Sequence, residues 1–406
     1  MTSDAAPPFR LSSLGLSVYL PTFLFAVGQG AIIPIIPQFA TNVGATIALA
    51  ALVVGLRGIG TMVFDVPSGI LIGRFGERTA MLVGTALLVV VALGASFAQT
   101  PVQVAALVFV MGGAWSIWGL ARLTYVSDQA PVESRGRALS LVGGTSRAGN
   151  FVGPLIGGLC GEWLGLGSVF WLQAAFAVSA SAIMFVLIRE ADGAAAVHHD
   201  SIYQRFTGVL VENRHVFLTA GMATVCLQVL RTSRQAVLPL WGQQNGMSPS
   251  EIGLIFGISS AVDMLLFYPV GMVMDRWGRK WVAAPSLIVL GLSLMLIPLA
   301  DTFTSLMLVG LVAGVGNGLG AGIVMTLGAD FSPPSSRGEF LGVWRLIGDI
   351  GTAGGPVVLS VLTGVLSLGA ASVATGGIGF VGAAIVVLFV AEPLKQKQAR
   401  PSPPPG

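Results

Sequence analysis

Twelve long apolar runs dominate this 406-residue chain. They lie near residues 12–37, 46–72, 79–98, 102–126, 138–163, 168–189, 215–240, 250–273, 281–299, 303–328, 339–365 and 370–391. An α-helix needs about 20 apolar residues to cross the hydrocarbon core of a bilayer. A transmembrane barrel would instead show short segments of alternating polarity. The sequence therefore predicts an all-α membrane protein with twelve transmembrane helices.

The charge content supports this class and excludes others. Charged residues make up only 10% of the chain, against about 25% in a typical soluble domain. The 54% apolar content excludes a disordered chain, and a net charge of +3 without a dense basic patch argues against nucleic-acid binding. The cysteines and histidines have no metal-site spacing, so we expect neither metal nor cofactor. These residues are Cys160, Cys226, His198, His199 and His215.

Lys and Arg lie in alternate connections between the runs. The basic connections and tail hold Arg74, Arg78, Arg135, Arg137, Arg189, Arg205, Arg214, Arg276, Arg279, Lys280, Arg337, Lys395, Lys397 and Arg400. The other connections, near 38–45, 99–101, 164–167, 241–249, 300–302 and 366–369, hold none. Because cytoplasmic loops carry the excess of Lys and Arg, we expect both termini to be cytoplasmic in a multi-pass protein of the inner membrane.

The chain repeats itself at an offset of 202 residues. The matching positions include Pro37 and Pro239, Arg74 and Arg276, Asp128 and Asp330, Arg135 and Arg337, Gly149 and Gly351, and Pro154 and Pro356. The repeat predicts a six-helix bundle over 1–189, a cytoplasmic linker over 190–214 with a helical second part, a second bundle over 215–391, and a disordered tail over 392–406. Carriers that rock two bundles about a central site have such repeats.

Two loop motifs resemble the signature of the major facilitator superfamily, Gly-x-Leu-x-Asp-Arg-x-Gly-Arg-Arg/Lys. The second half reads Gly271-Met-Val-Met-Asp275-Arg276-Trp-Gly278-Arg279-Lys280, and the first reads Gly69-Ile-Leu-Ile-Gly73-Arg74-Phe-Gly76-Glu77-Arg78. The resemblance implies a twelve-helix transporter, usually monomeric, with a cytoplasmic latch at these loops. We expect Asp128 to pair with Arg74 and Asp330 with Arg276, and a weaker latch in the first half, where Gly73 and Glu77 depart from the pattern. The alternative is ordinary anchoring charge.

A second motif resembles the antiporter signature of this family. It comprises Gly149, Gly153, Pro154, Gly157 and Gly158 in the fifth run. The resemblance implies export, while small residues at this spacing also serve close helix packing. The first run resembles that of the tetracycline-type drug:proton antiporters, but Phe25 replaces an Asp and the fourth run lacks an Arg at Val108–Met111. These departures put the usual proton coupling and a cationic substrate in doubt.

Charged residues inside the runs are costly and mark cavities or ion pairs. In the resembled fold, helix 2 faces helix 11 and helix 5 faces helix 8. We therefore expect three pairs between the halves: Arg57 with Asp349, Asp65 with Arg345, and Arg147 with Asp263. The pairs either neutralise buried charge permanently or open and close as gates and proton sites.

The predicted substrate cavity lies among the first, fourth, seventh and tenth helices. Its candidate residues are Gln29, Trp115, Trp118, Gln228, Arg231, Arg234 and Asn317. Five arginines against three aspartates at membrane depth favour an anionic, zwitterionic or neutral polar ligand. For the tryptophans, packing is the alternative, and for Arg234 it is solvation near the outer mouth. Glycines at 314, 316, 318, 320 and 322 predict a bendable tenth helix.

These features predict a secondary active transporter, a proton-coupled exporter of a small drug or metabolite. The alternative is an importer or exchanger of an organic anion or nutrient. A membrane sensor or a lipid-moving protein ranks lower. The chain has no nucleophile–base set and no Gly-x-x-x-x-Gly-Lys-Ser/Thr loop, so we expect neither an enzyme nor ATP drive. The expected partners are a small molecule, protons and the lipid bilayer.

Overall fold

The computed structural model describes residues 15–188 and 202–392, and all its regular elements are helical. The first half comprises η2 (Gly15–Tyr19), α1 (Leu20–Ile32), α2 (Ile35–Asn42), α3 (Ile47–Ser96), α4 (Pro101–Gln129), α5 (Val132–Leu164) and α6 (Ser168–Leu187). The linker contains α7 (Ile202–Glu212) and α8 (Arg214–Val216), so its predicted helical part is present. The predicted tail after residue 392 and linker residues 189–201 lie outside the described residues.

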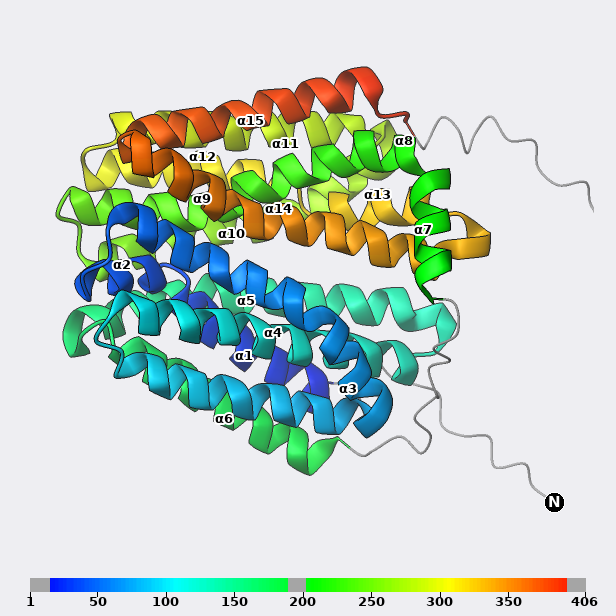
Figure 1. Cartoon of the computed structure of the whole chain (residues 1–406), viewed down its shortest axis with the longest axis horizontal. Helices are drawn as coiled ribbons and strands as arrows, with labels where there is room; N and C mark the ends of the chain where they lie inside the picture. Colours follow the sequence, from blue (N-terminus) through cyan, green and yellow to red (C-terminus); the bar gives the residue numbers. More distant parts are fainter. Residues whose placement is uncertain (1–14, 189–201, 393–406) are drawn as a thin grey trace, which may run out of the picture.

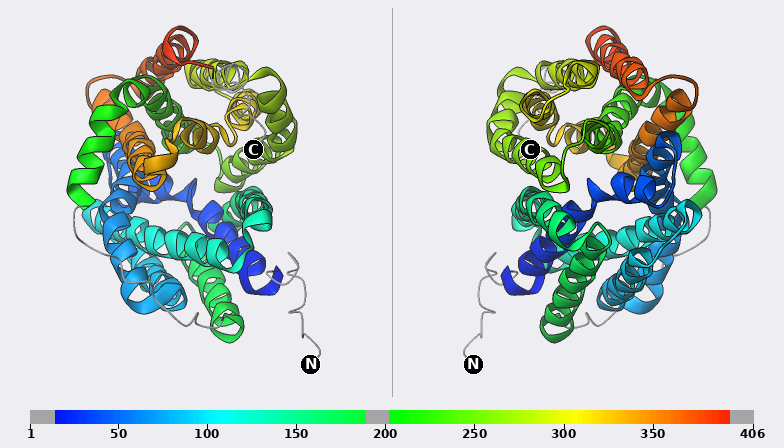
Figure 2. Two further views of the ribbon diagram at one scale, coloured as in Figure 1. Left: turned by 90° about the vertical axis from the view of Figure 1, so that its right-hand side faces the viewer. Right: turned by 90° about the vertical axis from the view of Figure 1, so that its left-hand side faces the viewer.

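The second half repeats this order. It comprises η3 (Phe217–Gly221), α9 (Met222–Gln244), α10 (Pro249–Trp277), α11 (Lys280–Leu296), η4 (Ile297–Leu299), α12 (Phe303–Leu319), α13 (Ile323–Phe331), η5 (Pro334–Ser336), α14 (Arg337–Val365) and α15 (Leu368–Phe389). In Figure 1, α1–α6 form the lower group and α9–α15 the upper one, and α7 crosses one end. Seen end-on, the two groups close into a ring (Figure 2).

The predicted membrane spans correspond to these helices. Ten helices of the described residues are long and apolar enough to cross a membrane. One of them, α3, contains two predicted spans, which meet where Gly76 leaves helical geometry at φ 79°. The remaining predicted span is α5, a 33-residue helix that includes Arg135, Arg137 and Arg147 and is not among the ten.

We call the end of the bundle that carries Arg74, Arg135, Arg276 and Arg337 the basic end. The opposite end lies at the connections that lack Lys and Arg. Helices α3, α4, α10, α12 and α15 begin at the opposite end with N-cap side chains that accept a hydrogen bond from the first turn, whose amides have no partner within the helix; α6, capped by Gly167, does not. Thr100 and Ser248 form capping boxes with Gln103 and Glu251.

The 202-residue repeat is visible in the packing. A Cβ at Gly149 would lie 2.8 Å from the carbonyl oxygen of Phe23, and a Cβ at Gly351 would lie 2.7 Å from that of Val225. Phe23 and Val225 are themselves 202 residues apart. Glycine at both positions lets α5 approach α1, and α14 approach α9, as closely as backbone allows.

The two halves touch at the opposite end. Thr41 Oγ1 lies 2.9 Å from Gln243 Oε1, and these two residues are also counterparts at the 202-residue offset. The Ser250 amide donates to Glu162 Oε2 at 3.2 Å. A Cβ at Gly158 would lie 2.6 Å from the carbonyl oxygen of Pro249, so α5 and α10 are in backbone contact there.

Towards the basic end, the same helices have open space around them. Among the described residues, Gly69, Gly143, Gly144 and Gly271 have no atom within 4 Å of the position a Cβ would take. Asp275 is 83% exposed, and Val66 and Leu265 are each 72% exposed. The described halves are therefore in backbone contact at the opposite end, while these positions of α3, α5 and α10 are uncovered towards the basic end.

Candidate functional site

A small cavity of about 110 Å³ lies where the two halves meet. Both halves line it, with Ile33, Ile36, Val54, Arg57, Gly58 and Thr61 from the first and Thr232, Gln235 and Thr352 from the second. Of the described residues that line it, Arg57 alone is charged. Of the predicted cavity residues, none lines this space, and its hydroxyl and amide groups were missed. Polar residues within an apolar run, such as Thr232 and Gln235, were the sequence feature that could have predicted these lining groups.

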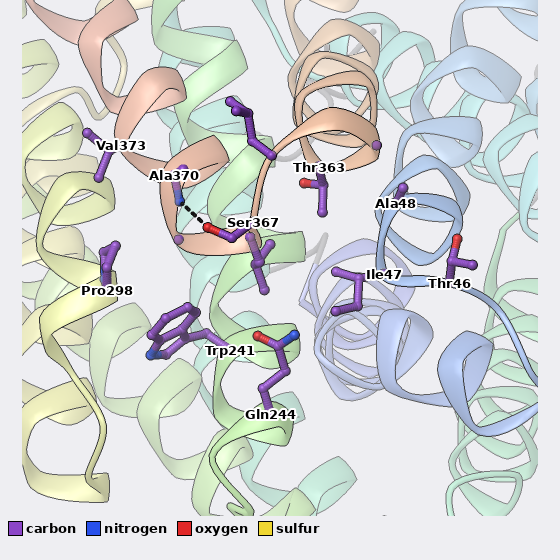
Figure 3. Close-up of a pocket in the computed structure, with 14 residues that line it drawn as sticks. Thr46, Ile47, Ala48, Trp241, Gln244, Pro298, Thr363, Ser367, Ala370 and Val373 are labelled. Carbon is purple, nitrogen blue, oxygen red and sulfur yellow. Dashed lines mark hydrogen bonds between the residues drawn. The ribbon is translucent and has the colours of Figure 1, made fainter.

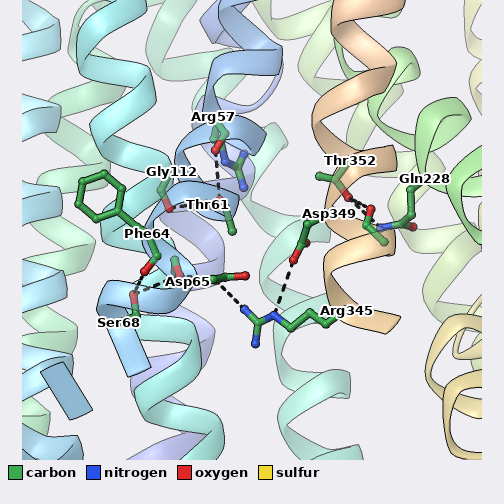
Figure 4. A network of polar contacts seen from close by, with 12 residues as sticks. Arg57, Thr61, Phe64, Asp65, Ser68, Gly112, Gln228, Arg345, Asp349 and Thr352 are labelled. Atoms are coloured by element: carbon green, nitrogen blue, oxygen red, sulfur yellow. Dashed lines mark hydrogen bonds and ion pairs between the residues drawn. The ribbon is translucent and has the colours of Figure 1, made fainter. Parts of the chain in front are cut away.

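An ion-pair network joins α3 to α14 beside this cavity (Figure 4). Arg345 Nη2 donates to Asp65 Oδ1 at 3.0 Å, and Arg345 Nε lies 3.7 Å from Asp349 Oδ2. Ser116 also donates to Asp65, and the Ser116 hydroxyl lies 3.2 Å from that of Ser68. The predicted pair of Asp65 and Arg345 is therefore present, and it connects the two halves.

A second network joins α5 to α10. Arg147 Nη1 donates to Asp263 Oδ2 at 2.6 Å, which is the predicted pair. The Arg147 guanidinium also lies 4.6 Å from the ring centre of Phe267. Arg231 and Arg234 lie within electrostatic range of Asp263. Three arginines thus lie around one aspartate, which leaves excess positive charge at this contact between the halves.

Both remaining arginines of this cluster reach polar partners in the second half. Arg234 is 8% exposed and donates to Ser259 Oγ at 2.8 Å, so it is not a solvated residue at an outer mouth. Arg231 donates to Gln228 Oε1 at 3.1 Å and to the Asn317 carbonyl at 3.4 Å. Gln228 in turn donates to Thr352 Oγ1 at 3.0 Å, which links the cluster to the cavity.

The predicted pair of Arg57 and Asp349 is wrong. Arg57 lies over the Trp115 ring at 5.7 Å from its centre, and Asp349 lies beside Arg345. The register explains the difference, because a Cβ at Gly58 would lie 2.9 Å from the Cα of Ala353. Arg57 is therefore level with the turn after Asp349. Among the described residues, Arg57 has no ion pair.

The predicted cavity aromatics are packed together. Phe25 stacks on Trp118 at 3.7 Å between ring centres and on Trp115 at 5.4 Å, so the rings fill the space between α1 and α4. Trp118 is fully buried, which favours packing over substrate stacking. Gln29 is 1% exposed, and neither amide atom has a hydrogen-bond partner among the described residues.

The loop motif of the second half is built differently from the prediction. Asp330 pairs with Arg279 at 2.7 Å, and the predicted pair with Arg276 is wrong. Gly278, at φ 107°, ends α10 and turns the chain so that Arg279 is buried at the start of α11, while Arg276 stays exposed. Glu392 accepts hydrogen bonds from the amides of Arg279 and Lys280 at 3.0 and 3.1 Å. These contacts stay within the second half.

The first-half motif lacks this arrangement. Arg74 lies over the Phe75 ring at 5.4 Å from its centre, and no ion pair joins it to Asp128 in the described part of the chain. Asp128 is exposed at the end of α4. The missing acid at Gly73 and the acidic Glu77 explain why no equivalent of the Arg279–Asp330 pair forms here.

We predict that Arg279→Leu destabilises the second half. Both members of the pair are buried, with side-chain exposures of 10% for Arg279 and 7% for Asp330. Removing one member of a buried pair costs about 3–5 kcal/mol. Thermal unfolding of the purified protein in detergent measures the effect. The control, Arg276→Leu, changes an exposed neighbour and should leave the midpoint nearly unchanged; equal midpoints for the two variants would contradict the assignment.

The antiporter-like glycines lie at two helix contacts. Gly149, Gly153 and Gly157 face the backbone of α1, and Gly158 faces α10 across the halves. Pro154 lies within α5 beside Gly30. The motif therefore makes close contacts within the first half and between the halves at the opposite end.

The tenth predicted span is broken, as its glycines indicate. Helix α12 ends at Leu319 and α13 begins at Ile323, with Gly322 at φ 78° between them. Side chains satisfy carbonyl groups around the break: Ser286 donates to Gly316 at 2.6 Å and Trp344 to Val324 at 2.8 Å. The break lies next to the arginine cluster, through the Arg231–Asn317 contact.

A larger pocket of about 940 Å³ lies at the opposite end (Figure 3). The starts of α3 and α15 and the ends of α9 and α14 form it, and Trp241, Gln244, Thr46 and Ile47 line it. Among the described residues, no charged side chain lines the pocket. Its neutral walls distinguish it from the charged interface between the halves.

The sequence of this chain matches those of known membrane carriers. A sequence profile of the Major Facilitator Superfamily matches residues 18–234 and again 220–405. An uncharacterised MFS-type transporter of Methanocaldococcus jannaschii is 21% identical over 355 residues, covering 86% of this chain and 91% of the relative. The multidrug resistance protein MdtG of Salmonella choleraesuis is 24% identical over 372 residues, covering 89% and 91%.

Solved structures share the fold. A D-xylose–proton symporter superposes with a TM-score of 0.75 at 16% identity, covering 94% of this chain and 98% of that one. A POT family transporter in complex with 5-aminolevulinic acid gives a TM-score of 0.78 at 13% identity, with coverage of 93% and 95%. At these identities the likeness concerns the fold alone.

Proposed function

The chain belongs to the major facilitator superfamily, and from that premise we propose that this transporter is a proton-coupled exporter of a small organic anion or zwitterion. The fold assigns transport by a multi-pass membrane protein. The proposal adds the driving ion, the direction and the charge of the cargo. In it, residues 1–189 and 215–391 are the two moving bundles, and the basic end faces the cytoplasm of the cell.

The observation that carries the proposal is the pair of ion networks across the halves. Asp65 with Arg345, and Arg147 with Asp263, each join one half to the other. The two halves cannot separate at these seams without breaking the pairs. A freed aspartate can take a proton, so opening and protonation become one coupled event.

The charge balance supports an anionic or zwitterionic cargo. Arg147, Arg231 and Arg234 share Asp263, and Arg57 lines the central cavity without an ion pair among the described residues. A positively charged, poorly hydrated site attracts negative charge. A lipophilic cation would be repelled by the same arrangement.

Export rests on two supports. The MdtG relative is named a multidrug resistance protein, and the glycines from Gly149 to Gly158 match the antiporter signature in this sequence. With the basic end cytoplasmic, the described state would receive cargo from the cytoplasm. The alternative is an importer or exchanger of an organic anion, which the same basic site would also suit.

Transport in vesicles tests the proposal. Purified protein reconstituted with its basic end outside should accumulate labelled organic anions when the vesicle interior is acidic. Collapse of the pH gradient with a protonophore should stop accumulation. Saturable flux that ignores the gradient would overturn proton coupling, and accumulation only with the reversed gradient would favour the importer.

A further inference from the structure

The first half contains a half-buried arginine with buried donor atoms that sequence reasoning missed. Arg122 lies in α4, one turn after Trp118, and its guanidinium carbon is 4.3 Å from the Trp118 ring centre. Its Nε and Nη1 atoms are buried and have no hydrogen-bond partner among the described residues. No ion pair reaches Arg122 in that part of the chain. A buried cation without a counter-ion is costly, which indicates that something else supplies the negative charge.

Other buried donors lie on the same side of the aromatic stack. The Trp118 indole NH, the Thr22 hydroxyl and the Tyr19 hydroxyl also lack partners among the described residues. Helices α1 and α4 run in opposite directions, and Phe25 stacks on Trp118 at 3.7 Å. Residues before Phe25 therefore lie beside residues after Trp118. Thr22 and Tyr19 thus fall at the level of Arg122, on the basic-end side of the stack.

No carboxylate forms an ion pair with Arg122 in the described residues. The first turns of η2 and α1 have no acidic residue, Asp65 is engaged by Ser116 and Arg345, and Glu77 lies in electrostatic range of Tyr125, three residues beyond Arg122. Asp128 is exposed and lies six residues beyond Arg122, about 9 Å along the helix. The donors of this group are thus one cation and several neutral N–H and O–H groups.

We propose that Arg122, with the Trp118, Thr22 and Tyr19 donors, forms a subsite for the carboxylate of an organic monoanion with an apolar body. One guanidinium balances one negative charge, and its planar donors match a carboxylate. A phosphate dianion would need a second cation. The packed Phe25 and Trp118 rings make the surroundings of Arg122 apolar, which suits an apolar rather than a hydrated ligand body. The subsite names the cargo class and therefore rests on the proposed function.

Binding to the full-length protein tests the subsite separately from transport. The probes are benzoate, benzyl alcohol as its neutral counterpart, and benzylamine as a cation, titrated by calorimetry into protein in phosphatidylcholine nanodiscs. Benzoate should bind, and the other two should bind at least about tenfold more weakly. Arg122→Gln should weaken benzoate binding at least about tenfold. Arg122→Lys keeps the positive charge but not the planar guanidinium with its paired donors, so it should give an intermediate affinity.

Arg78→Gln is the matched control. Arg78 also lies over an aromatic ring, with its guanidinium carbon 5.2 Å from the ring centre of Phe185, and it donates to the Phe185 carbonyl at 2.7 Å. Benzoate affinity should be unchanged in that variant. Equal benzoate binding by wild type, Arg122→Gln and Arg122→Lys would overturn the subsite, as would absence of benzoate binding to wild type.

A change of lipid in the nanodisc distinguishes two sources of negative charge, an organic carboxylate and a lipid phosphate. If anionic phosphatidylglycerol in the nanodisc abolishes benzoate binding through Arg122, a lipid phosphate occupies the subsite and the carboxylate assignment is overturned. Persistent binding supports it. If benzoate binds through Arg122 but vesicles show no pH-driven flux, the subsite is supported and the proposed proton coupling is contradicted. The two proposals can therefore fail separately.

Discussion

Asp349→Asn should reduce pH-driven flux to the level of protein-free vesicles while the protein still folds. Asp349 is the second carboxylate of the network in which Arg345 bridges to Asp65. The substitution removes an acid that can exchange a proton when the seam opens. Arg345 keeps its 3.0 Å contact with Asp65, so losing the 3.7 Å contact should cost no more than about 1 kcal/mol. Flux in reconstituted vesicles and thermal unfolding in detergent measure the two effects.

A matched aspartate variant separates loss of coupling from general damage. Asp301→Asn neutralises an exposed aspartate in the connection before α12 and should leave both flux and unfolding unchanged. Full pH-driven flux in Asp349→Asn would remove Asp349 from the mechanism. A low unfolding midpoint in Asp349→Asn alone would show that the acid is structural.

Gly158→Val should prevent closure at the opposite end. A Cβ at Gly158 would lie 2.6 Å from the Pro249 carbonyl oxygen and 3.0 Å from the Ser250 Cα. Backbone atoms cannot yield as a flexible side chain does, and overpacking costs about 1–3 kcal/mol. Such a cost shifts a two-state equilibrium by about 5- to 150-fold. The variant should therefore favour the state open at the opposite end and lose most of its transport.

Chemical accessibility measures this shift. With Cys160 and Cys226 replaced by serine, a cysteine at Thr232 reports on the central cavity. An impermeant maleimide added at the opposite end should label it about tenfold faster in Gly158→Val. Gly144→Val is the control on the same helix, because nothing lies within 4 Å of its Cβ position. Equal labelling rates in both variants would show that the α5–α10 contact does not control closure.

The sequence predicted the helices and the general location of the charged interface. The length of the apolar runs predicts the helices, because a helix must match the thickness of the bilayer. The 202-residue repeat predicts two halves, because matching residues recur in each. Two predicted pairs form, Asp65 with Arg345 and Arg147 with Asp263. The predicted pair of Arg57 and Asp349 is wrong because the two residues lie about one helical turn apart in depth. Counting residues from the helix ends does not reveal the relative position of α3 and α14, which the close contact of Gly58 with Ala353 sets.

Other site features depend on three-dimensional packing that sequence patterns do not contain. Arg122 lies near the end of its apolar run, where a basic residue is typical of a loop-facing anchor. Only the packing shows that the guanidinium of Arg122 lies over the Trp118 ring, on which Phe25 stacks. Likewise, the positive φ of Gly278 decides that Arg279 rather than Arg276 reaches Asp330.

The contact between Thr41 and Gln243 has a consequence for the symmetry of the molecule. In a symmetric dimer, a residue touches its own copy only where it lies beside the two-fold axis, and these two residues are counterparts at the 202-residue offset. The two halves therefore meet there as the copies of a symmetric dimer would. Their charges do not follow this symmetry, because Arg147 corresponds to Asp349 and Asp263 to Thr61. The two seams occupy equivalent places but differ in polarity, so they need not release together.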